Sequence, residues 1–503
     1  MKLLPFGESA VLLDLEIEYA SDRARRTLGI AQALRASFPC ADIVPAAGTI
    51  ALLNIHEKDS GTILGIAAQL LSEAGPPPLE GQFHTIHAVY DGPDLEGMAQ
   101  SLHIDREYII ELHTGREVMA ELLGFLPGFA YLGPIDKRLI MARKPSPRPR
   151  VAAGSIALAG CFTGIYPLIS PGGWNLIGRS IDTILFDPMR EPPILLKAGD
   201  RVRFVRIPKE DAPPPHKFPP EALPESIGQR GIEIIGAPPC TTVQDIGRIG
   251  CLHLGFPPSG PQDFMYFQKA NLAVGNHPNE AALEIPLGTL RLRALGPICI
   301  SLDGRAAQRL GDGEEWSFEA NERALRYLAI EGGFSVSDRL GSKATLLGAH
   351  FGGFGGRMLK RGDRLYASQR PSSADTNRPP YSDMDELGQD PIVLEVSPGP
   401  HQERFPHQAM QIFLSGEFSV STLSNRVGTR LEGLKIPRDG PDLALPAPMR
   451  RGAIQITSDG TPIVLGPDHP VTGGYPLLAM LSARSQAMLS RLKPGSKVRF
   501  RLC

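Results

Sequence analysis

The sequence predicts a mainly β protein of the α+β class, with two related β-rich modules in one chain. Two segments far apart share one pattern, in which a glycine opens an alternating strand that leads through a turn and an apolar strand to a Gly-Gly-aromatic corner. The chain also holds 54 Gly and 48 Pro among 503 residues, which favours short strands joined by tight turns. Beyond residue 228 nearly every segment is strand-like, apart from a helical stretch over Phe264–Val274.

The repeat is anchored on Gly154 in the first half and on Gly452 in the second half. The corners Gly172–Gly173 and Gly473–Gly474 follow their anchors at similar spacing. Each copy is followed by one more hydrophobic strand, over Gly199–Phe204 and over Pro494–Phe500. Because internal self-similarity reflects architecture, we expect two kindred β modules that build one polar cleft around their glycine corners.

The first 83 residues predict a small α/β subdomain. Strands over Ala10–Leu15 and Thr49–Asn54 flank a segment with helical spacing over Ser21–Ser37. A second helical segment follows over Thr62–Glu73.

Residues 84–206 predict a separate β domain with two helices, over Asp94–Leu102 and Arg106–His113. Asp105 precedes the second helix, where its carboxylate can accept unpaired backbone N–H groups. The next stretch, residues 207–228, contains seven prolines and predicts an extended linker. Residues 229–503 then form the second β-rich part, interrupted by a polar loop or insertion over Ser368–Asp390.

Composition excludes several classes of function. The formal charge of −2, with aromatic residues at only 6%, gives no electrostatic or stacking basis for binding nucleic acid or anionic membrane. The six cysteines contain no CxxC pair, which argues against a disulfide framework or a zinc site. Acidic residues interrupt any signal-peptide core near the N-terminus, and no apolar run approaches the ~20 residues of a membrane helix. We therefore expect a cytoplasmic globular protein.

Both halves contain motifs that resemble known families. The first half resembles allophanate hydrolase subunit 1, on the motifs Val89–Leu95, His113, Gly124–Leu132, Gly154–Ser155 and Ser170–Trp174. The second half resembles the companion subunit 2 family, on the motifs Thr242–Arg248, Pro258–Gly260, Asp263, Ala270–Asn271, Gly275–Asn276, Leu283–Glu284, Gly341–Ser342, Arg426–Gly433 and Gly473–Pro476. The chain thus looks like both subunits fused through the proline-rich linker.

The resemblance implies cyclophilin-like β-barrels in both halves. Family members are similar to the B and C subunits of an ATP-dependent 5-oxoprolinase, which act with a separate A-type subunit on a small cyclic amide. Related proteins form the carboxyltransferase part of urea carboxylase, which uses biotin on a separate carrier, and others resemble a Kip-type kinase inhibitor and its antagonist. The resemblance leaves open whether the chain forms a homo-oligomer.

The chain departs from the family pattern at three places. Phe162 stands where a glutamine usually precedes Thr-Gly-Ile-Tyr-Pro, and Ala152 replaces the usual proline. The tyrosine that normally follows His113 is missing near Glu117-Val118. Losing the glutamine amide removes a donor and an acceptor from the expected polar pocket, which bears directly on the substrate.

In the first half, the loop Gly124–Leu132 is a candidate for binding substrate through backbone amides near Gly128, with Phe129 and Tyr131 beside them. The corner of Gly172, Gly173 and Trp174 is a second candidate. The alternative interpretation is that both are tight turns with packed aromatic side chains.

His113 is a candidate general acid or base, since imidazole titrates near neutral pH; a buried core histidine is the alternative. Arg150, within a proline-broken segment that also contains Arg143 and Arg148, is a candidate for binding a carboxylate or phosphate. A solvated basic loop is the alternative there.

In the second half, Asp245 and Arg248 are candidate catalytic residues, in a turn where a carboxylate orients a guanidinium. Asp263 and Asn271 are candidate pocket residues, and structural capping is the alternative. Gly473 and Gly474 form the second glycine corner. A glycine-rich run over Gly352–Gly356 resembles an anion-binding nest, although such runs are commonly turns.

Motifs of several other chemistries are absent from the sequence. It contains no GxxxxGK[ST] loop, no HExxH metal motif, no GxSxG elbow and no amidase-type Ser-Ser-Lys signature. These absences exclude other chemistries, and the family resemblance implies a component of an ATP-dependent 5-oxoprolinase. A biotin-dependent carboxyltransferase of the urea carboxylase type and a Kip-type regulator are the alternatives.

Overall fold

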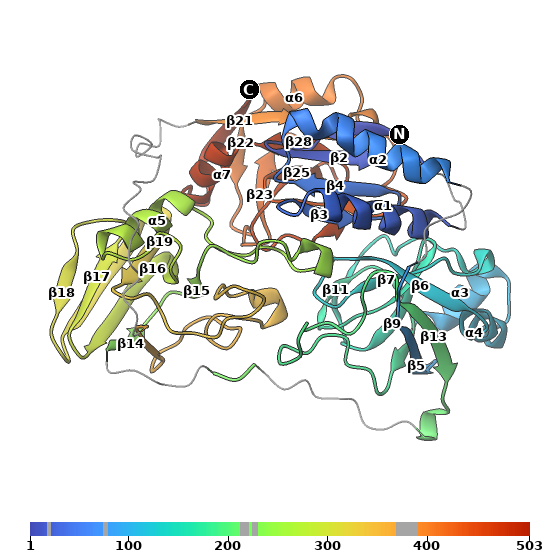
Figure 1. Ribbon diagram of the computed structural model, residues 1–503, viewed down its shortest axis with the longest axis horizontal. Helices are drawn as coiled ribbons and strands as arrows, with labels where there is room; N and C mark the ends of the chain where they lie inside the picture. Colours follow the sequence, from blue (N-terminus) through green and yellow to red (C-terminus); the bar gives the residue numbers. More distant parts are fainter. Residues whose placement is uncertain (18–21, 74–78, 212–220, 224–229, 369–390) are drawn as a thin grey trace.

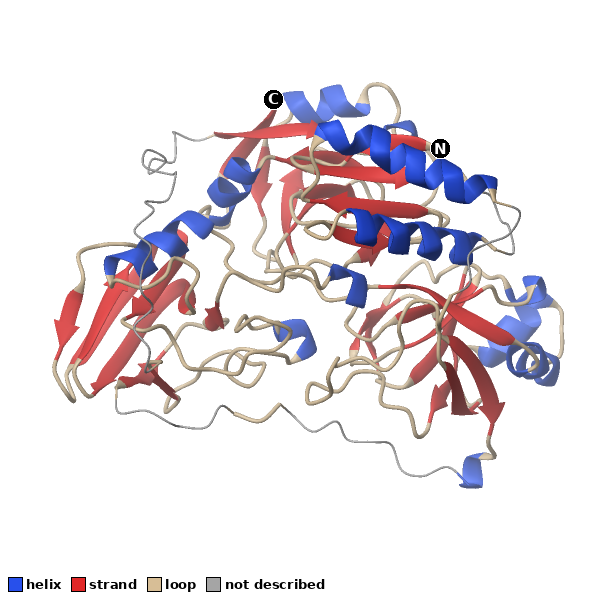
Figure 2. Ribbon diagram, in the orientation of Figure 1, coloured by secondary structure: helices blue, strands red, loops and turns tan. Residues whose placement is uncertain are grey.

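The computed structural model describes residues 1–17, 22–73, 79–211, 221–223, 230–368 and 391–503. Within them the chain forms a small α/β unit, a closed β-barrel, an open mixed domain and a second closed β-barrel, in that order (Figures 1 and 2). The protein is therefore mainly β with few helices, as the sequence predicts. Most of the predicted linker and the predicted insertion lie outside the described residues.

The N-terminal unit is a four-stranded antiparallel sheet with two helices on one face. Its strand order is β1-β2-β4-β3. Its elements are β1 (Lys2–Pro5), β2 (Ala10–Asp14), α1 (Arg23–Ser37), β3 (Asp42–Pro45), β4 (Thr49–Leu53) and α2 (Ser60–Ser72). The opposite face of the sheet packs on the second barrel, through a buried cluster that joins Phe6, Leu12 and Val44 to Met449 and Met480.

The first barrel closes in the order β10-β7-β6-β13-β5-β12-β9. Its elements are β5 (Phe83–Val89), α3 (Leu95–Leu102), α4 (Arg106–Thr114), β6 (Glu117–Leu123), β7 (Ala130–Gly133), β9 (Ser155–Ala159), β10 (Phe162–Ile165), β12 (Asn175–Ser180) and β13 (Arg201–Arg206). The first and last strands, β5 and β13, pair in parallel. The predicted cap of α4 is confirmed, because Asp105 accepts a hydrogen bond from the N–H of Glu107 at 2.7 Å.

The third domain, which we call the mixed domain because it combines strands with a helix, is a twisted antiparallel sheet covered by one helix. Its elements are β14 (Gly231–Gly236), β15 (Thr242–Gln244), α5 (Phe264–Ala273), β16 (Ala282–Leu295), β17 (Ile298–Leu302), β18 (Gln308–Leu310), β19 (Glu315–Ile330) and β20 (Arg364–Tyr366). The antiparallel pair β16 and β19 forms its centre. The predicted helix over Phe264–Val274 is confirmed as α5.

The second barrel closes in the order β21-β28-β25-β26-β23-β22-β29. Its elements are β21 (Ile392–Pro398), α6 (Ala409–Ser415), β22 (Phe418–Val420), β23 (Gly428–Gly433), β25 (Ala453–Ile456), β26 (Pro462–Leu465), β28 (Leu477–Leu481), α7 (Ala483–Ser490) and β29 (Lys497–Leu502). Its first and last strands, β21 and β29, again pair in parallel. The helices α6 and α7 were not expected from the sequence.

The internal repeat corresponds to the two barrels, strand for strand. Gly154 and Gly452 share a φ of +82°, a left-handed conformation that favours glycine. Each anchor glycine accepts a hydrogen bond of 2.8 Å from the neighbouring strand of its barrel, from the N–H of Ser180 and of Leu481 respectively. Each barrel also has a small accessory sheet that contains its glycine corner. These sheets pair β8 (Arg148–Val151) with β11 (Ser170–Gly172), and β24 (Ala447–Pro448) with β27 (Thr472–Gly473).

The two halves of the chain pack on each other in a crossed arrangement. While the N-terminal sheet covers the second barrel, loops of the mixed domain reach the first barrel (Figure 1). Phe256 and Phe351 from those loops share one buried cluster with Phe186 of the first barrel, with ring centroids 5.3 to 6.0 Å apart. Each half therefore packs on the other half's barrel, and this brings the two accessory sheets together.

Candidate active site

A cavity of about 370 Å³ lies between the two glycine corners. From the first half it is lined by residues of the Gly124–Leu132 loop, the Arg143–Pro147 segment and the Gly172–Trp174 corner. From the second half it is lined by Asp442, Gln455, Ser458, Pro470, Thr472, Gly473, Gly474 and Tyr475. The expected arrangement, in which both corners face a common cavity, is present.

A second, wider chamber of about 860 Å³ adjoins the first. They form one cleft with a narrow and a wide part, because the two chambers share Arg143, Lys144, Pro145, Trp174, Asp442 and Ser458. The wide part is further lined by Phe162, Lys435, Arg438, Asp459 and the Gly440–Ala444 loop. Phe162, which replaces the usual family glutamine, therefore lies on the wall of this cleft.

The narrow part has an aromatic wall. Phe129 lies edge-on to Trp174 and to Tyr166, with ring centroids 5.3 and 5.5 Å apart, and Tyr131 lies 5.5 Å from Trp174. Such edge-to-face arrangements hold large rings in fixed positions. Phe129, Tyr131 and Trp174 are thus packed against one another and also line the cavity, and their role in binding substrate stays a prediction.

Arg143 is the cation at the centre of the cleft. Its side chain is exposed, and it forms no ion pair or hydrogen bond with any residue that the structure describes. A Cβ added at Gly474 would lie 3.2 Å from one terminal nitrogen of Arg143, so the missing side chain of Gly474 makes room for the guanidinium. An unpaired guanidinium suits a carboxylate or phosphate of a ligand.

The neighbouring cations are already paired. Asp94 accepts from Lys144 at 2.7 Å and from Arg148 at 2.6 Å, and it also accepts the N–H of Leu176. Arg150 points from β8 as an exposed side chain and does not line either chamber. Among the three arginines of this segment, Arg143 therefore fits the anion-binding role better than the predicted Arg150.

The glycine corners allow close packing around the cleft. A Cβ at Gly172 would lie 2.2 Å from the Tyr166 hydroxyl, whereas one at Gly173 would meet nothing closer than 3.6 Å.

Burial raises the pKa of Tyr166 to about 12 and also raises that of Tyr131, so both phenols are neutral donors at neutral pH.

Thr472, beside the second glycine corner, packs against the Gly124–Leu132 loop of the first half. A Cβ at Gly124 would lie 2.0 Å from its hydroxyl, so the first half's loop sits directly against β27. The hydroxyl is buried and has no hydrogen bond of normal geometry within the described chain, although it is close enough to Tyr131 to favour that residue's ionised form. It is therefore a spare polar group on the cavity wall.

Gly128 has a supporting position. Its φ is +83°, and an added Cβ would meet the Phe186 side chain at 3.0 Å and the Leu185 carbonyl at 3.1 Å. It does not itself line the cavity. Gly128 thus shapes the loop that carries Phe129.

His113 lies in the interior of the first barrel, not among the cleft residues. Its ring nitrogens contact the Tyr90 hydroxyl at 2.6 Å and the Thr163 hydroxyl at 2.9 Å, and its ring lies 4.4 Å from that of Phe204. Burial lowers its pKa to about 3, so it is neutral at physiological pH. The structure matches the alternative interpretation, a buried core histidine.

Asp245 and Arg248 brace a loop of the mixed domain and do not line the cleft. Asp245 accepts from the Ser342 hydroxyl at 2.5 Å and from the N–H of Lys343 at 2.6 Å. Arg248 is fully buried, donates to the Ala344 carbonyl and lies over the Phe351 ring at 4.8 Å. The two residues do not form the expected ion pair with each other.

Asp263 and Asn271 also have structural positions outside the cleft. Asp263 caps α5 and forms a buried ion pair with Arg491 of the second barrel at 2.6 Å. Asn271 donates to the Glu280 carbonyl at 2.8 Å and accepts from Asn276 at 3.0 Å. Capping, the alternative interpretation, describes the position of Asp263.

The glycine-rich run does hold an anion, but one from the chain itself. The N–H of Gly352 donates to the buried carboxylate of Glu221 at 2.6 Å, and Arg339 pairs with the same carboxylate at 2.9 Å. Arg357 is instead engaged by Asp363 at 2.7 Å. The run therefore anchors the segment that follows the first half.

Sequence reasoning missed several cleft residues. These are Tyr166, Asp442, Gln455, Ser458, Thr472 and Tyr475. The repeat carried a usable signal for some of them, because Thr472 and Tyr475 flank the second glycine corner. Among the described residues, no group of three or more histidine, cysteine or acidic side chains is arranged to hold a metal, and no helix is long and apolar enough to cross a membrane.

Comparisons with known proteins agree with the division into halves. Residues 1–196 match the family described as carboxyltransferase domain, subdomain C and D, and residues 254–502 match carboxyltransferase domain, subdomain A and B. The crystal structure of TTHA0988 superposes with a TM-score of 0.82 and 31% identity, covering 98% of this chain and 99% of that one.

Curated relatives match each half separately. The B subunit of 5-oxoprolinase from Escherichia coli O157:H7 is 38% identical over 40% of this chain and 93% of its own length, while the C subunit from E. coli K12 is 32% identical over 54% and 91%. The B subunit from Bacillus subtilis is 49% identical over 120 residues, and the chain spans half of its length. Urea amidolyase of Lachancea kluyveri is 32% identical over 52% of this chain, which spans 16% of that protein.

The chain belongs to the carboxyltransferase-domain family and contains both pairs of subdomains. More particularly, it joins in one polypeptide a half related to the B subunit of 5-oxoprolinase and a half related to the C subunit.

Proposed function

We propose that this protein is the fused B and C component of an ATP-dependent 5-oxoprolinase, which opens the cyclic amide of 5-oxoproline to glutamate together with a separate A-type subunit. The observation that carries the proposal is the cleft built jointly by a B-like and a C-like half. When one site forms only where two polypeptides touch, joining the two in a single chain keeps the site assembled.

The cleft chemistry suits a small cyclic amide that carries a carboxylate. The unpaired Arg143 would bind the carboxylate, and the wall of Phe129 and Trp174 would pack against the ring. The Thr472 hydroxyl is available to the amide. Phosphorylating the amide oxygen would make the carbonyl carbon a better electrophile for water, and hydrogen-bond donors would stabilise the resulting oxyanion.

The composition of the same cleft supports the proposed need for a partner. Its described lining includes no histidine or cysteine, and its two carboxylates, Asp442 and Asp459, already pair with Arg438 and Lys435 at 2.8 Å. It therefore offers binding groups but no free general base. We propose that the A-type subunit supplies the missing groups at the open, wide chamber, where ATP would also be handled.

Reconstitution tests the proposal. The purified chain is mixed with an A-type 5-oxoprolinase subunit, and ATP-dependent glutamate release from 5-oxoproline is measured. We expect turnover only with both proteins present. Full activity of the chain alone, or none with the partner, would count against the proposal.

A matched pair of arginine variants tests the site. Arg143→Gln removes a charged hydrogen bond to the substrate carboxylate, so the KM for 5-oxoproline should rise about tenfold or more. Arg150→Gln, an exposed arginine seven positions along the same segment that lines neither chamber, is the control and should leave the KM unchanged. Equal effects of the two substitutions would remove Arg143 from the site.

A second candidate function is carboxyl transfer, because the matching families are described as carboxyltransferase domains and urea amidolyase is among the relatives. This reaction would use biotin on a separate carrier protein, which would enter the wide chamber. Streptavidin blotting of proteins that copurify with the chain discriminates the two functions. A biotinylated partner, together with no glutamate release in the reconstituted assay, would favour the carboxyltransferase.

A further inference from the structure

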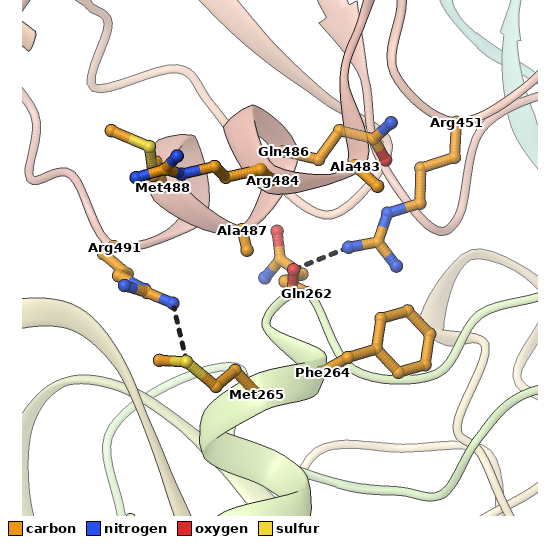
Figure 3. A pocket seen from close by; sticks show the side chains of 10 residues that line it. All are labelled: Gln262, Phe264, Met265, Arg451, Ala483, Arg484, Gln486, Ala487, Met488 and Arg491. Carbon is orange, nitrogen blue, oxygen red and sulfur yellow. Dashed lines mark hydrogen bonds between the residues drawn. The ribbon is translucent and has the colours of Figure 1, made fainter. Parts of the chain in front are cut away.

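A third cavity, of about 210 Å³, lies between the mixed domain and the second barrel (Figure 3). Its lining comes from the start of α5 and from Gln262 two residues before it, from the turn that precedes β25, and from α7 with the residue that follows it. The lining residues are Gln262, Phe264, Met265, Arg451, Ala483, Arg484, Gln486, Ala487, Met488 and Arg491. None of them lines the cleft between the glycine corners, so this is a separate site.

The charge of this cavity is one-sided. Three arginines line it and no carboxylate does. Arg491 is paired with Asp263, whereas Arg451 donates only to the carbonyls of Pro261 and Gln262, at 2.9 and 2.6 Å. Because burial removes water from around its guanidinium, the pKa of Arg451 is lowered, and the carboxylates of Glu284 and Asp263, with which it forms no ion pair, offset this only in part. Charges in such places are normally paired with an opposite charge, and here no described carboxylate forms an ion pair or hydrogen bond with Arg451.

Arg484 is the second cation without a partner. It lies exposed on the first turn of α7 and forms no hydrogen bond or ion pair with any described residue. Two acidic groups lie nearby and bond to residues of the lining, since Glu8 accepts the N–H of Ala483 at 3.2 Å and Glu284 accepts from Gln262, but neither is paired with Arg484 in the described structure. Two guanidinium groups at this cavity are therefore open to an anion.

The rest of the wall is apolar. Phe264, Met265, Ala487 and Met488 line the cavity, and the guanidinium of Arg451 lies 5.2 Å from the ring centre of Phe264. In Figure 3, Ala487 faces the segment that holds Gln262, and Arg451 and Arg491 approach from opposite sides. A cavity of ~150 Å³ holds a benzene ring, so this one has room for a ring or chain of roughly six carbons with a carboxylate attached.

We propose that this cavity is a second binding site, for a small organic monocarboxylate whose apolar body packs on Phe264, Met265 and Met488 while its carboxylate binds Arg451 and Arg484. The site bridges two domains, since Met265 belongs to the mixed domain and the arginines belong to the second barrel. A bound carboxylate would therefore hold α5 and α7 together.

Methionine-methyl NMR of the full chain tests the proposal, with benzoate as the probe. The sequence holds 12 methionines, and Met265→Leu and Met488→Leu assign the two signals of the cavity. We expect benzoate to shift both signals saturably, and benzamide, its neutral counterpart of similar shape, to shift them at least tenfold more weakly. Met449, which lies against Gly473 at the main cleft, reports on binding there.

Two variants probe the contacts without removing buried polar groups. Arg484→Gln should raise the Kd of benzoate about tenfold, and Arg361→Gln, an exposed arginine of the mixed domain that has no described partner, should leave it unchanged. Ala487→Leu should fill the cavity and abolish the shifts of Met265 and Met488. If benzoate moves only Met449, if benzamide binds equally well, or if neither variant changes the Kd, the proposal is overturned. Since no turnover or partner is involved, these outcomes are independent of the proposed enzymatic activity.

Discussion

Residue type alone did not decide which candidates belong to the site. His113, Asp245 and Arg248 have side chains suited to catalysis, yet the structure surrounds each with protein partners and places none of them at the cleft. Arg143 and Arg150 are indistinguishable in the sequence, because both lie in one proline-broken segment. Only the folded structure separates them, because it places Arg143 beside Gly474 and leaves Arg150 on β8 outside the cleft.

Buried neutral histidines predict acid sensitivity. Burial lowers the pKa of His113 to about 3, and those of His401 and His469 to about 4, while the unfolded side chains titrate near their usual value of about 6.5. Between the folded pKa values and the unfolded value of about 6.5, the unfolded state binds more protons than the folded state. The free energy of unfolding therefore rises with pH in this range. Each such histidine should lower the free energy of unfolding by up to about 1.4 kcal/mol per pH unit as the pH falls below 6.5.

The measurement is the unfolding temperature of the wild type and of His113→Phe between pH 7 and pH 5. The wild type should lose stability on acidification, and the variant should show a shallower dependence even though its stability at pH 7 is lower. Identical slopes would mean that His113 is not neutral in the folded protein.

At the scale of elements, the repeat was the most informative sequence signal. It predicted paired modules and facing corners, because a left-handed glycine followed by an alternating strand is a local feature that a sequence records directly. The helices α6 and α7, with 7 and 8 residues, were missed, although α3, which also has 8 residues, was predicted; α6 has no side-chain cap that would mark its start. Ser482, whose hydroxyl accepts from the N–H of Ser485, was a usable start signal for α7.

The first glycine corner gives a prediction with an internal control. Gly172→Ala would place a Cβ 2.2 Å from the Tyr166 hydroxyl, so the aromatic wall must shift and the KM for 5-oxoproline should rise several-fold. Gly173→Ala would meet only ordinary contacts at 3.6 Å and should be nearly neutral. Steady-state kinetics of the reconstituted enzyme measures both, and a neutral Gly172→Ala would show that Tyr166 does not position the substrate.

For the whole molecule, the sequence predicted separate modules but not their interlocking. The N-terminal sheet covers the second barrel, and Phe256 and Phe351 of the mixed domain reach the first. Such long-range contacts depend on matching apolar surfaces, and no local periodicity reveals which surface meets which. The linker region between residues 207 and 228 was placed from proline content alone.

The interlocking predicts that the covalent link is dispensable once the protein has folded. A protease site inserted into residues 212–220 and then cleaved should leave two fragments that coelute in size-exclusion chromatography. Phe6→Asp, which puts a charge into the fully buried cluster with Met449 and Met480, should release the fragments. Phe83→Asp, at a position that is 47% exposed, should not. Separation of the wild-type fragments would contradict this account.

The docking of the N-terminal sheet on the second barrel also constrains the order of biosynthesis. Phe6, Leu12 and Val44 leave the ribosome hundreds of residues before Met449 and Met480, which will cover them. For most of translation the nascent protein therefore exposes an apolar surface that would otherwise be buried. Chaperones that recognise exposed hydrophobic segments are expected to hold this surface until the distant barrel has been made.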